Sequence, residues 1–347
     1  MQKESIATQR KSSFYLESAS HTDYLRELSS VYPALAAILD FRRTGADAAL
    51  EALAGVVTEF DSDDNGRGDS YRRAQQDAAV RLTGIKRLIR LVAPEASRDH
   101  ATILDILGGD GTLARAVAGS GSTGLASKLT LFTSDISAEM IEQALAYGLP
   151  AIRQAATFLF LKDESVDGAL LAYGTHHIAP ADRLRAVTEA VRVVRPGGNI
   201  VLHDFAESSP MARFFAEVVH RFSVAGHDYP HFCRDALVDL FDDAGTPAGI
   251  LDVYDPLIVA ADSPEIVRRL MCDYLADMYG VRKFFDGQPD EATAWEYICD
   301  IFDHAEYLAS VSPAPSHRVR PEIYRSADQY VAEIPRYALV AVAEKKV

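Results

Sequence analysis

The stretch ATILDILGGDGTLARAVA, residues 101–118, decides the fold of this chain. An apolar run over 101–107 leads into the turn Gly108-Gly109-Asp110-Gly111, and an amphipathic segment begins at Thr112. Glycine allows unusual backbone dihedrals in a tight turn and lets a ligand approach the backbone closely. We therefore expect a strand, a turn and a helix in this order, with a ligand at the carboxyl end of the strand.

Short strand-like runs continue to alternate with amphipathic segments further along the chain, which is typical of a parallel sheet flanked by helices. One such helical segment carries an apolar stripe of Leu184, Val187, Val191 and Val194. The sequence therefore predicts an α/β fold. Beyond the first strand, the expected strands cover residues 129–134, 168–174, 199–205, 250–259 and 337–343.

Helical patterns lie on both sides of this α/β unit. Apolar residues recur at helical spacing before residue 100, as at Ile85 and Ile89, and again after residue 262, as at Ile266 and Leu270. We expect an N-terminal helical extension that forms a lid or a homodimer contact, a catalytic core, a helical insertion that covers the substrate, and a last core strand. The corresponding residues are 1–99, 100–262, 263–333 and 334–347.

The charge of the chain favours small-molecule partners. Its 347 residues include 35 Lys plus Arg and 50 Asp plus Glu, which gives a net charge of −15. Such a chain lacks the basic surface that drives nucleic-acid binding, and anionic membranes repel it. Eleven acidic and four basic residues lie between Asp262 and Glu306, so this segment carries −7 of the total. The acidity indicates either a cationic acceptor or simply a solvated helix face.

Cysteine content and the N-terminus predict a cytoplasmic location. Cys233, Cys272 and Cys299 are widely spaced, without the pairing pattern of a disulfide framework or a zinc site. The first twenty residues are polar throughout, unlike a secretory signal peptide, and no apolar run approaches the length of a membrane span.

Four segments in order indicate a family. The second predicted strand ends at Asp135, 24 residues after Gly111, a spacing that suits an acid binding ribose hydroxyls. ILDILGGDG, DISAEMIEQA, DGALLAYGTHHI and VRPGGNIVLHDF begin at residues 103, 135, 167 and 194. Together they resemble the class I (Rossmann-like) S-adenosylmethionine-dependent methyltransferases of the small-molecule type.

The resemblance implies a seven-stranded Rossmann-like sheet that binds S-adenosylmethionine and releases S-adenosylhomocysteine. It places Asp135 at the ribose, Ile136 against the adenine, and Tyr173 beside the cofactor. The chain departs from the family pattern at Leu107, which replaces a glycine, and at Ala155, where an adenine-binding acid is common and Gln154 is a substitute. The first strand and its turn would hold the methionine moiety through Asp105, Gly108, Gly109, Asp110 and Gly111.

Candidate catalytic residues lie at the ends of the predicted strands 168–174 and 199–205, since the carboxyl ends of strands border the ligand crevice in such a sheet. They are Tyr173, His176, His177 and Asp204, with either histidine as a general base at neutral pH. The alternative is that the two histidines only hold the loop after their strand. His203 is expected to be a core residue.

The sequence leaves open whether the protein binds a metal ion. His227 and His231, together with Asp204, offer the two histidines and one carboxylate that bind non-haem iron, and some methyltransferases that act on 2-oxo acids resemble this arrangement. The alternative is a helix start or lid without metal, because no tight ligand spacing is present.

The sequence thus predicts methyl transfer from S-adenosylmethionine to a small molecule, in specialised metabolism, with no nucleic-acid or membrane partner. Three alternatives remain: a metal-assisted C-methyltransferase acting on a 2-oxo acid, possibly one with a cationic side chain; a related fold that catalyses a reaction other than methylation; and a non-enzymatic binding protein.

Overall fold

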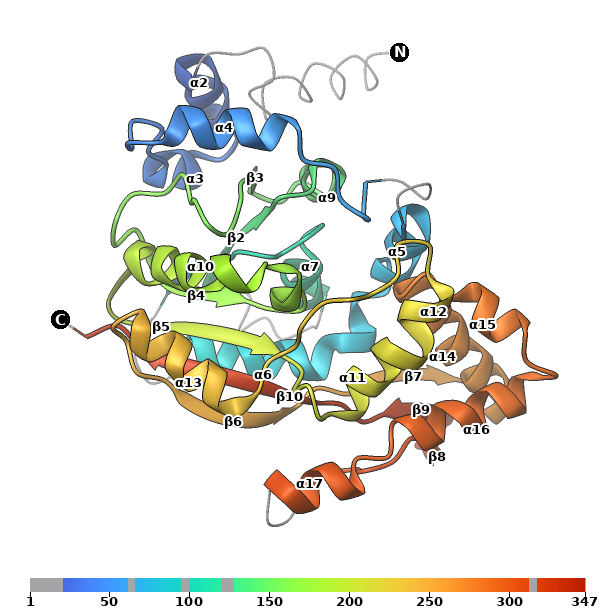
Figure 1. Cartoon of the computed structure of the whole chain (residues 1–347). Coiled ribbons are helices and arrows are strands. Elements are labelled where there is room, and N and C mark those ends of the chain that lie inside the picture. Colours follow the sequence, from blue (N-terminus) through green and yellow to red (C-terminus); the bar gives the residue numbers. More distant parts are fainter. Residues whose placement is uncertain (1–20, 62–65, 95–99, 120–127, 312–316, 347) are drawn as a thin grey trace, which may run out of the picture.

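A central sheet with seven strands organises the computed structural model, which describes residues 21–61, 66–94, 100–119, 128–311 and 317–346 (Figure 1). Its spatial order is β3-β2-β1-β4-β5-β10-β6, and β10 runs antiparallel to both of its neighbours. The predicted α/β class and its seven-stranded sheet are confirmed. The strands are β1 (Ala101–Asp105), β2 (Leu129–Asp135), β3 (Ala151–Arg153), β4 (Val166–Leu171), β5 (Val194–Asp204), β6 (Gly249–Tyr254) and β10 (Tyr337–Glu344).

Helices cover both faces of this sheet. On one face, α6 buries Ile85, Leu88 and Ile89 in the stripe that its periodicity predicts. On the other face, α10 buries Ala186, Val187, Ala190 and Val193, whereas Leu184 of the predicted stripe is exposed. The covering helices are α6 (Leu82–Val92), α7 (Thr112–Gly119), α9 (Ala138–Ala146), α10 (Pro180–Val193) and α13 (Arg234–Asp243).

The N-terminal segment divides into two parts (Figure 1). Its first helices lie beside the β3 edge, where Tyr24, Leu28 and Phe41 join the same core as Phe160. Helix α5 lies apart from them, on the right in Figure 1, against α14 (Pro264–Met278) of the insertion. The elements are α2 (His21–Val31), α3 (Pro33–Ile38), α4 (Ala46–Ala54), α5 (Gly68–Gln75) and the 3₁₀ helix η1 (Ala78–Arg81).

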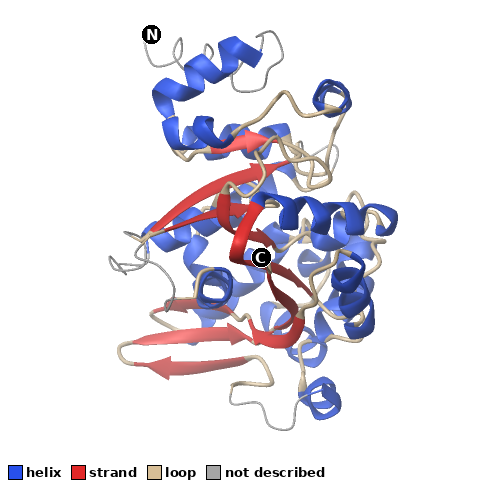
Figure 2. Cartoon of the chain, turned by 90° about the vertical axis from the view of Figure 1, so that its left-hand side faces the viewer, coloured by secondary structure: helices blue, strands red, loops and turns tan. Residues whose placement is uncertain are grey.

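The single strand expected over Ile250–Val259 is wrong. The chain leaves the central sheet after β6, passes Asp255-Pro256, and enters a second antiparallel sheet of order β7-β9-β8. Proline lacks the N–H that a continuous strand would donate at this position. Figure 2 shows a long hairpin of two strands low in the molecule, beside the strands of the main sheet. The bounds are β7 (Leu257–Ala261), β8 (Glu322–Ser326) and β9 (Gln329–Ile334).

The insertion after β7 is mostly helical, as expected, but it also contains β8 and β9. Its acidic side chains pair on the outside: Asp277 with Arg73 at 3.0 Å, and Asp300 with Arg213 at 2.8 Å. No helix in the described ranges combines the length and apolar character needed to cross a membrane. The helices are α14 (Pro264–Met278), α15 (Arg282–Asp286), α16 (Glu291–Ile301) and α17 (Ala305–Val311).

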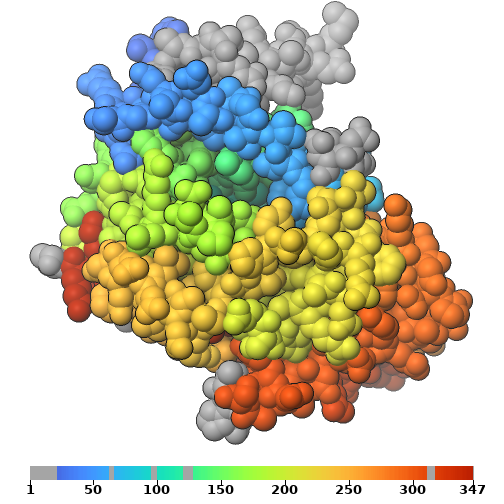
Figure 3. All heavy atoms as spheres, in the orientation of Figure 1, coloured from blue at the N-terminus to red at the C-terminus, as the bar shows by residue number. Residues whose placement is uncertain are grey.

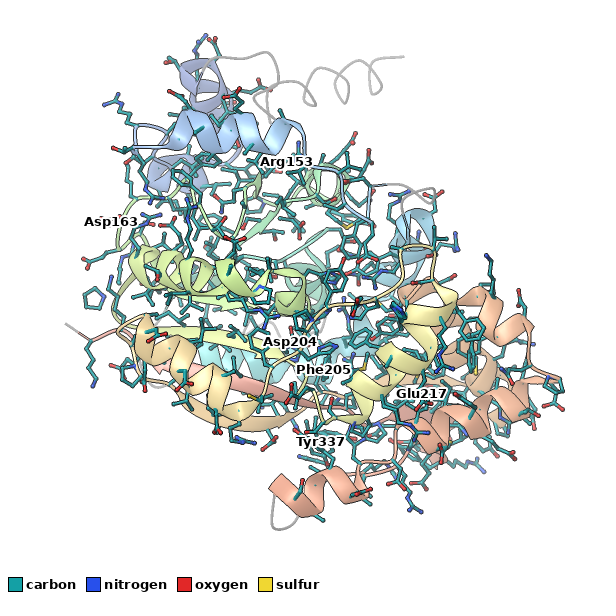
Figure 4. The ribbon with its side chains drawn as sticks, in the orientation of Figure 1. Arg153, Asp163, Asp204, Phe205, Glu217 and Tyr337 are labelled. Carbon is teal, nitrogen blue, oxygen red and sulfur yellow. The ribbon has the colours of Figure 1, made fainter. Side chains whose placement is uncertain are left out.

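Between β5 and α13 the chain forms α11 (Pro210–Phe214), a π-helical turn η3 (Phe215–Val219) and α12 (His220–Phe222). A further 3₁₀ turn, η2 (Thr175–His177), follows β4. These short elements bring side chains to the carboxyl ends of β4 and β5, where Figure 4 shows Asp204 and Phe205 in the middle of the molecule.

Candidate functional site

The turn after β1 has the geometry that its glycines predict. Gly109 and Gly111 have φ of 55° and 79°, values that other residues adopt at a cost. The Gly109 N–H donates to Asp135 Oδ2 at 3.0 Å, and the Gly108 N–H donates to the Ser134 carbonyl at 2.8 Å. The turn is therefore tied directly to the end of β2.

A cavity of about 320 Å³ opens over this turn. Its size lies in the range of small-molecule sites. Figure 3 shows the surface hollowed between the blue N-terminal segment and the green segments of the core. Four of the predicted cofactor residues line the cavity, together with Leu107 and His177. The four are Gly109, Asp135, Ile136 and Tyr173. The N-terminal segment adds Val57, Thr58, Glu59, Phe60 and Tyr71.

Two acidic side chains are buried beside this cavity. Burial raises the pKa of Asp135 to about 6, although N–H groups of Gly109 and Ser137 favour its charged form. Burial and the nearby Asp135 charge raise the pKa of Asp105 to about 7. Among the described residues, neither carboxylate forms an ion pair with a basic side chain. Both are thus placed to accept hydrogen bonds from a ligand or to neutralise its positive charge.

Two of the predicted cofactor residues, Asp110 and Gln154, have other contacts. The Asp110 carboxylate accepts from Arg115 at 2.6 Å and from the Thr112 hydroxyl at 2.7 Å. Gln154 Oε1 accepts from the Phe160 N–H at 2.9 Å, and neither Gln154 nor Ala155 lines the described cavity. Asp110 thus holds the start of α7, and Gln154 holds the loop after β3.

A second, smaller cavity of about 40 Å³ adjoins the first. The two share Phe60, Tyr71, Tyr173 and His177 as common walls. The second cavity also contains the predicted residues His176 and Asp204. Sequence reasoning missed the remaining charged lining, Arg67, Arg81 and Arg336.

Arg81 differs from the other two arginines. Arg67 binds Glu59 at 2.8 Å and Arg336 binds Asp255 at 2.7 Å, whereas within the described structure Arg81 has no ion-pair partner. It is 6% exposed and contacts the Gln75 amide and the Tyr173 ring. Arg81 precedes Ile85 by four residues, so its place on the buried face of the adjoining helix was readable from the sequence.

Arg81 also lines a small recess together with Asp105, Gly108 and Gly109. A buried guanidinium without a carboxylate is costly unless a ligand completes it. The recess therefore combines one buried cation with one buried acid, a pattern that matches the carboxylate and ammonium groups of an amino acid.

Tyr173 stands where the two cavities meet. Its backbone has a φ of 61°, which is rare for a tyrosine and typical of strained functional positions. Its hydroxyl donates to Asp255 Oδ1 at 3.1 Å, and its ring lies 4.4 Å from that of His203. His203 itself is fully buried, as expected of a core residue. The contacts with Asp255 and His203 thus hold Tyr173 in place, and Tyr173 lines both cavities.

Asp204 organises the histidines around the second cavity. Its carboxylate accepts from the backbone N–H of His176 and of Phe205, each at 2.7 Å. His176 Nδ1 lies 2.9 Å away and His231 Nδ1 lies 3.5 Å away. Burial opposes the charge of Asp204, but the two histidines hold its pKa well below the usual range. Asp204 is therefore an ionised anchor for two imidazoles.

The metal triad considered from sequence, His227, His231 and Asp204, does not come together as one group. His231 and Asp204 cluster with His176, whereas His227 clusters with His176 and His177. The loop between α12 and α13 turns the ring of His227 onto Phe215, with ring centroids 4.0 Å apart, and so directs it to η2.

The sheet order and the cavity over the turn after β1 define a Rossmann-like domain. Residues 104–202 match the family model of a methyltransferase domain. This part of the chain is therefore a methyltransferase domain of the class I type, for which S-adenosylmethionine is the cofactor. The resemblance seen in the motifs is confirmed.

Similar proteins of known name match part of the chain. Demethylmenaquinone methyltransferase of Beutenbergia cavernae is 28% identical over 152 residues, which cover 43% of this chain and 59% of the relative. The ubiquinone/menaquinone biosynthesis C-methyltransferase UbiE of Brucella anthropi is 31% identical over 124 residues, covering 35% of this chain and 46% of the relative. The chain thus spans about half the length of the curated relatives it matches.

Among solved structures, a chain of the complex between the Haloferax volcanii Trm112 methyltransferase activator and a methyltransferase is similar in fold. The TM-score is 0.51 at 17% identity, with 84% of this chain and 100% of that chain covered. At this identity the likeness concerns the fold alone.

Proposed function

We propose that this protein transfers a methyl group from S-adenosylmethionine to a small-molecule acceptor. The observation that carries the proposal is the wall shared by the two cavities, because methyl transfer needs the cofactor and the acceptor to meet in line at one point. Tyr173 and His177 lie at this point.

The residues present fit the cofactor. In the proposed complex, Asp135 binds the ribose hydroxyls, and Ile136 packs against the adenine. Asp105 faces the ammonium group of the methionine moiety, and Arg81 binds its carboxylate. The cofactor supplies an electrophilic methyl group on a positively charged sulfur. Asp105 and Asp135 also offset that positive charge.

The roles at the acceptor end are orientation and hydrogen bonding. Burial lowers the pKa of His177 well below its ordinary value, so its ring is neutral at pH 7 and its unprotonated nitrogen acts as a lone-pair donor rather than as a strong base. Asp204 holds His176 by its Nδ1 and backbone N–H, so we assign both residues to positioning. Tyr173 lines both cavities at the point where they meet.

The lining of the second cavity favours a neutral acceptor. Arg67 and Arg336 are paired with Glu59 and Asp255, Arg81 is assigned to the cofactor, and the acidic residues of the insertion do not contribute to the described lining. The cationic acceptor considered from composition is therefore not favoured. A role in specialised metabolism, a cytoplasmic location and a homodimer through the N-terminal helices remain proposals; sedimentation equilibrium tests the last.

The test begins with cofactor binding. We expect S-adenosylhomocysteine to bind the purified chain in calorimetry, and Asp135→Asn to weaken binding about 10- to 100-fold, since a hydrogen bond to a charged group contributes about 1.5–3 kcal/mol. Asp239→Asn is the matched control, because Asp239 is exposed on α13. Equal binding by both variants contradicts the assignment of Asp135.

The reaction is tested next by mass spectrometry of candidate acceptors incubated with enzyme and S-adenosylmethionine. The proposal requires a product that has gained one methyl group. A product changed in any other way supports the alternative of a non-methylating enzyme, and absence of S-adenosylhomocysteine binding overturns the proposal at its first step.

A further inference from the structure

Three histidines meet beside the second cavity. His176 and His177 belong to η2, and His227 comes from the loop after α12. One ring nitrogen from each lies within 4.8 Å of the others. The ring centroids of His176 and His177 are 4.4 Å apart, and that of His227 lies 5.0 and 5.7 Å from them. Segments about fifty residues apart in sequence thus bring three imidazoles to one point.

Two of these rings are oriented by carboxylates. His176 Nδ1 lies 2.9 Å from Asp204, and because an ionised carboxylate only accepts, this nitrogen carries the proton. His177 Nδ1 lies 3.6 Å from Glu59, whose carboxylate is held in place by Arg67. The hydrogen bond to Asp204 therefore leaves the Nε2 lone pair of His176 free, and Glu59 lies beside the ring of His177. A carboxylate behind the ring is the usual arrangement for a histidine that binds a metal.

The ring of His227 has no such carboxylate partner in the described structure. It is 6% exposed, and neither ring nitrogen has a hydrogen-bond partner in the described part of the chain. A neutral imidazole carries one N–H and one lone pair, and a metal ion at this point would use the lone pair.

A second grouping nearby needs no metal. His176, Asp204 and His231 also lie close together, but Asp204 already bridges the two rings through their Nδ1 atoms. Hydrogen bonding accounts for this contact. In the first group, His227 has no hydrogen-bond partner at either ring nitrogen within the described structure, whereas in the second group this holds only for Nε2 of His231.

We propose that His176, His177 and His227 bind one divalent transition-metal ion at the edge of the acceptor cavity. Imidazole ligands suit zinc, iron and nickel, and three protein ligands leave coordination positions open. His176 and His177 line the cavity, so an open position faces the acceptor. If the proposed methyl transfer holds, the site selects acceptors with an oxygen atom, and preferably two neighbouring ones, next to the atom that is methylated.

The test uses the full chain, dialysed against a chelator and then titrated with Co²⁺, whose visible spectrum reports tetrahedral or five-coordinate nitrogen binding. We expect one ion per chain. His227→Gln should weaken binding about 100-fold or more, and Asp204→Asn about 10-fold, which is the usual effect of removing a partner behind a ligand. His304→Gln is the control, since His304 is equally buried and lies outside the cluster.

The proposal is overturned if Co²⁺, Zn²⁺ and Fe²⁺ all fail to bind stoichiometrically, or if His227→Gln and His304→Gln bind equally well. Circular dichroism and melting confirm that each variant is folded, and His177→Gln replaces His227→Gln if the latter unfolds. S-adenosylhomocysteine binding is measured on the same chelator-treated sample. Loss of metal binding alone refutes only the metal site, whereas loss of S-adenosylhomocysteine binding alone refutes only the proposed function.

Discussion

The buried carboxylate of Asp105 lowers the stability of the folded protein, and it is placed to bind a ligand. It is 4% exposed at the end of β1, next to Asp135. Burial and that neighbouring charge raise its pKa from 3.8 to about 7. The folded protein therefore holds a proton on Asp105 that the unfolded chain releases between pH 4 and 7, so this residue makes folding less favourable as the pH rises through that range.

Asp105→Asn should therefore stabilise the ligand-free protein at pH 8. We expect the free energy of unfolding to rise by about 2–4 kcal/mol at pH 8 and by clearly less at pH 5, because each pKa unit corresponds to about 1.4 kcal/mol. Urea denaturation at the two pH values measures both.

Asp110→Asn is the matched control, since Asp110 is as deeply buried but forms an ion pair with Arg115 at 2.6 Å. Removing one partner of a buried pair is destabilising, so the two variants should shift in opposite directions at pH 8. A loss of stability in Asp105→Asn would show that its charge is already compensated. The same variant should bind S-adenosylhomocysteine more weakly, because the proposed ammonium contact is lost.

Helix α6 contains a glycine, Gly84, because a loop distant in sequence packs against it. Gly84 lies inside this helix, where alanine is ordinarily better by about 1 kcal/mol. A Cβ at Gly84 would lie 1.6 Å from Asp255 Oδ1. Asp255 in turn binds Arg336 and the Tyr173 hydroxyl, so the missing side chain makes room for a buried network under the site.

Gly84→Ala should destabilise the protein by about 2–4 kcal/mol despite the better helix propensity, because the methyl group displaces a buried charged network. It should also reduce methyl transfer more than S-adenosylhomocysteine binding, since Tyr173 loses its support. Thermal melting and calorimetry check the two effects. Gly119→Ala on α7, where a Cβ meets nothing within 4 Å, should leave both unchanged; similar effects for the two variants would refute the role of Asp255.

Element prediction succeeded where the signal was local. The glycine turn after β1 and the stripe of α6 depend on neighbouring residues, and both appear as predicted. The run 250–259 is rich in β-forming residues on both sides of Asp255-Pro256, and its pairing passes from β10 to β9 across that proline. Of the predicted stripe, Val187 and Val194 are buried, whereas Leu184 is exposed because α10 turns a face of alanine and valine toward the sheet. Long-range packing therefore decides what periodicity alone leaves ambiguous.

At the scale of the molecule, the two cavities differ in how far the sequence could predict them. The cofactor cavity is built largely on motifs within residues 105–177, so Asp105, Asp135 and Tyr173 were found in advance. The second cavity joins segments from residue 60 to residue 336, among them Arg81, Tyr274 and Arg336. Arg67 links two of these segments by donating to the Met278 carbonyl at 3.2 Å. No local pattern encodes such an assembly.

The N-terminal segment that closes over the cofactor cavity should respond to the ligand. Val57, Thr58, Glu59 and Phe60 line its mouth. Because a ligand that binds only the closed, folded form stabilises it by up to about 2.7 kcal/mol at one hundred times its Kd, hydrogen exchange should slow about tenfold or more over 57–60 and over the turn 107–111. Hydrogen-exchange mass spectrometry with and without S-adenosylhomocysteine measures this.

The hairpin β8–β9 serves as the internal control, because none of its described residues lines either cavity. Its exchange should change much less than that of 57–60. If exchange slowed over the turn 107–111 but not over 57–60, the ligand would bind the core without engaging the N-terminal segment, and residues 57–60 would be a fixed wall of the site. Protection of both segments together means that the extension completes the cofactor site, which explains why the chain continues so far before β1.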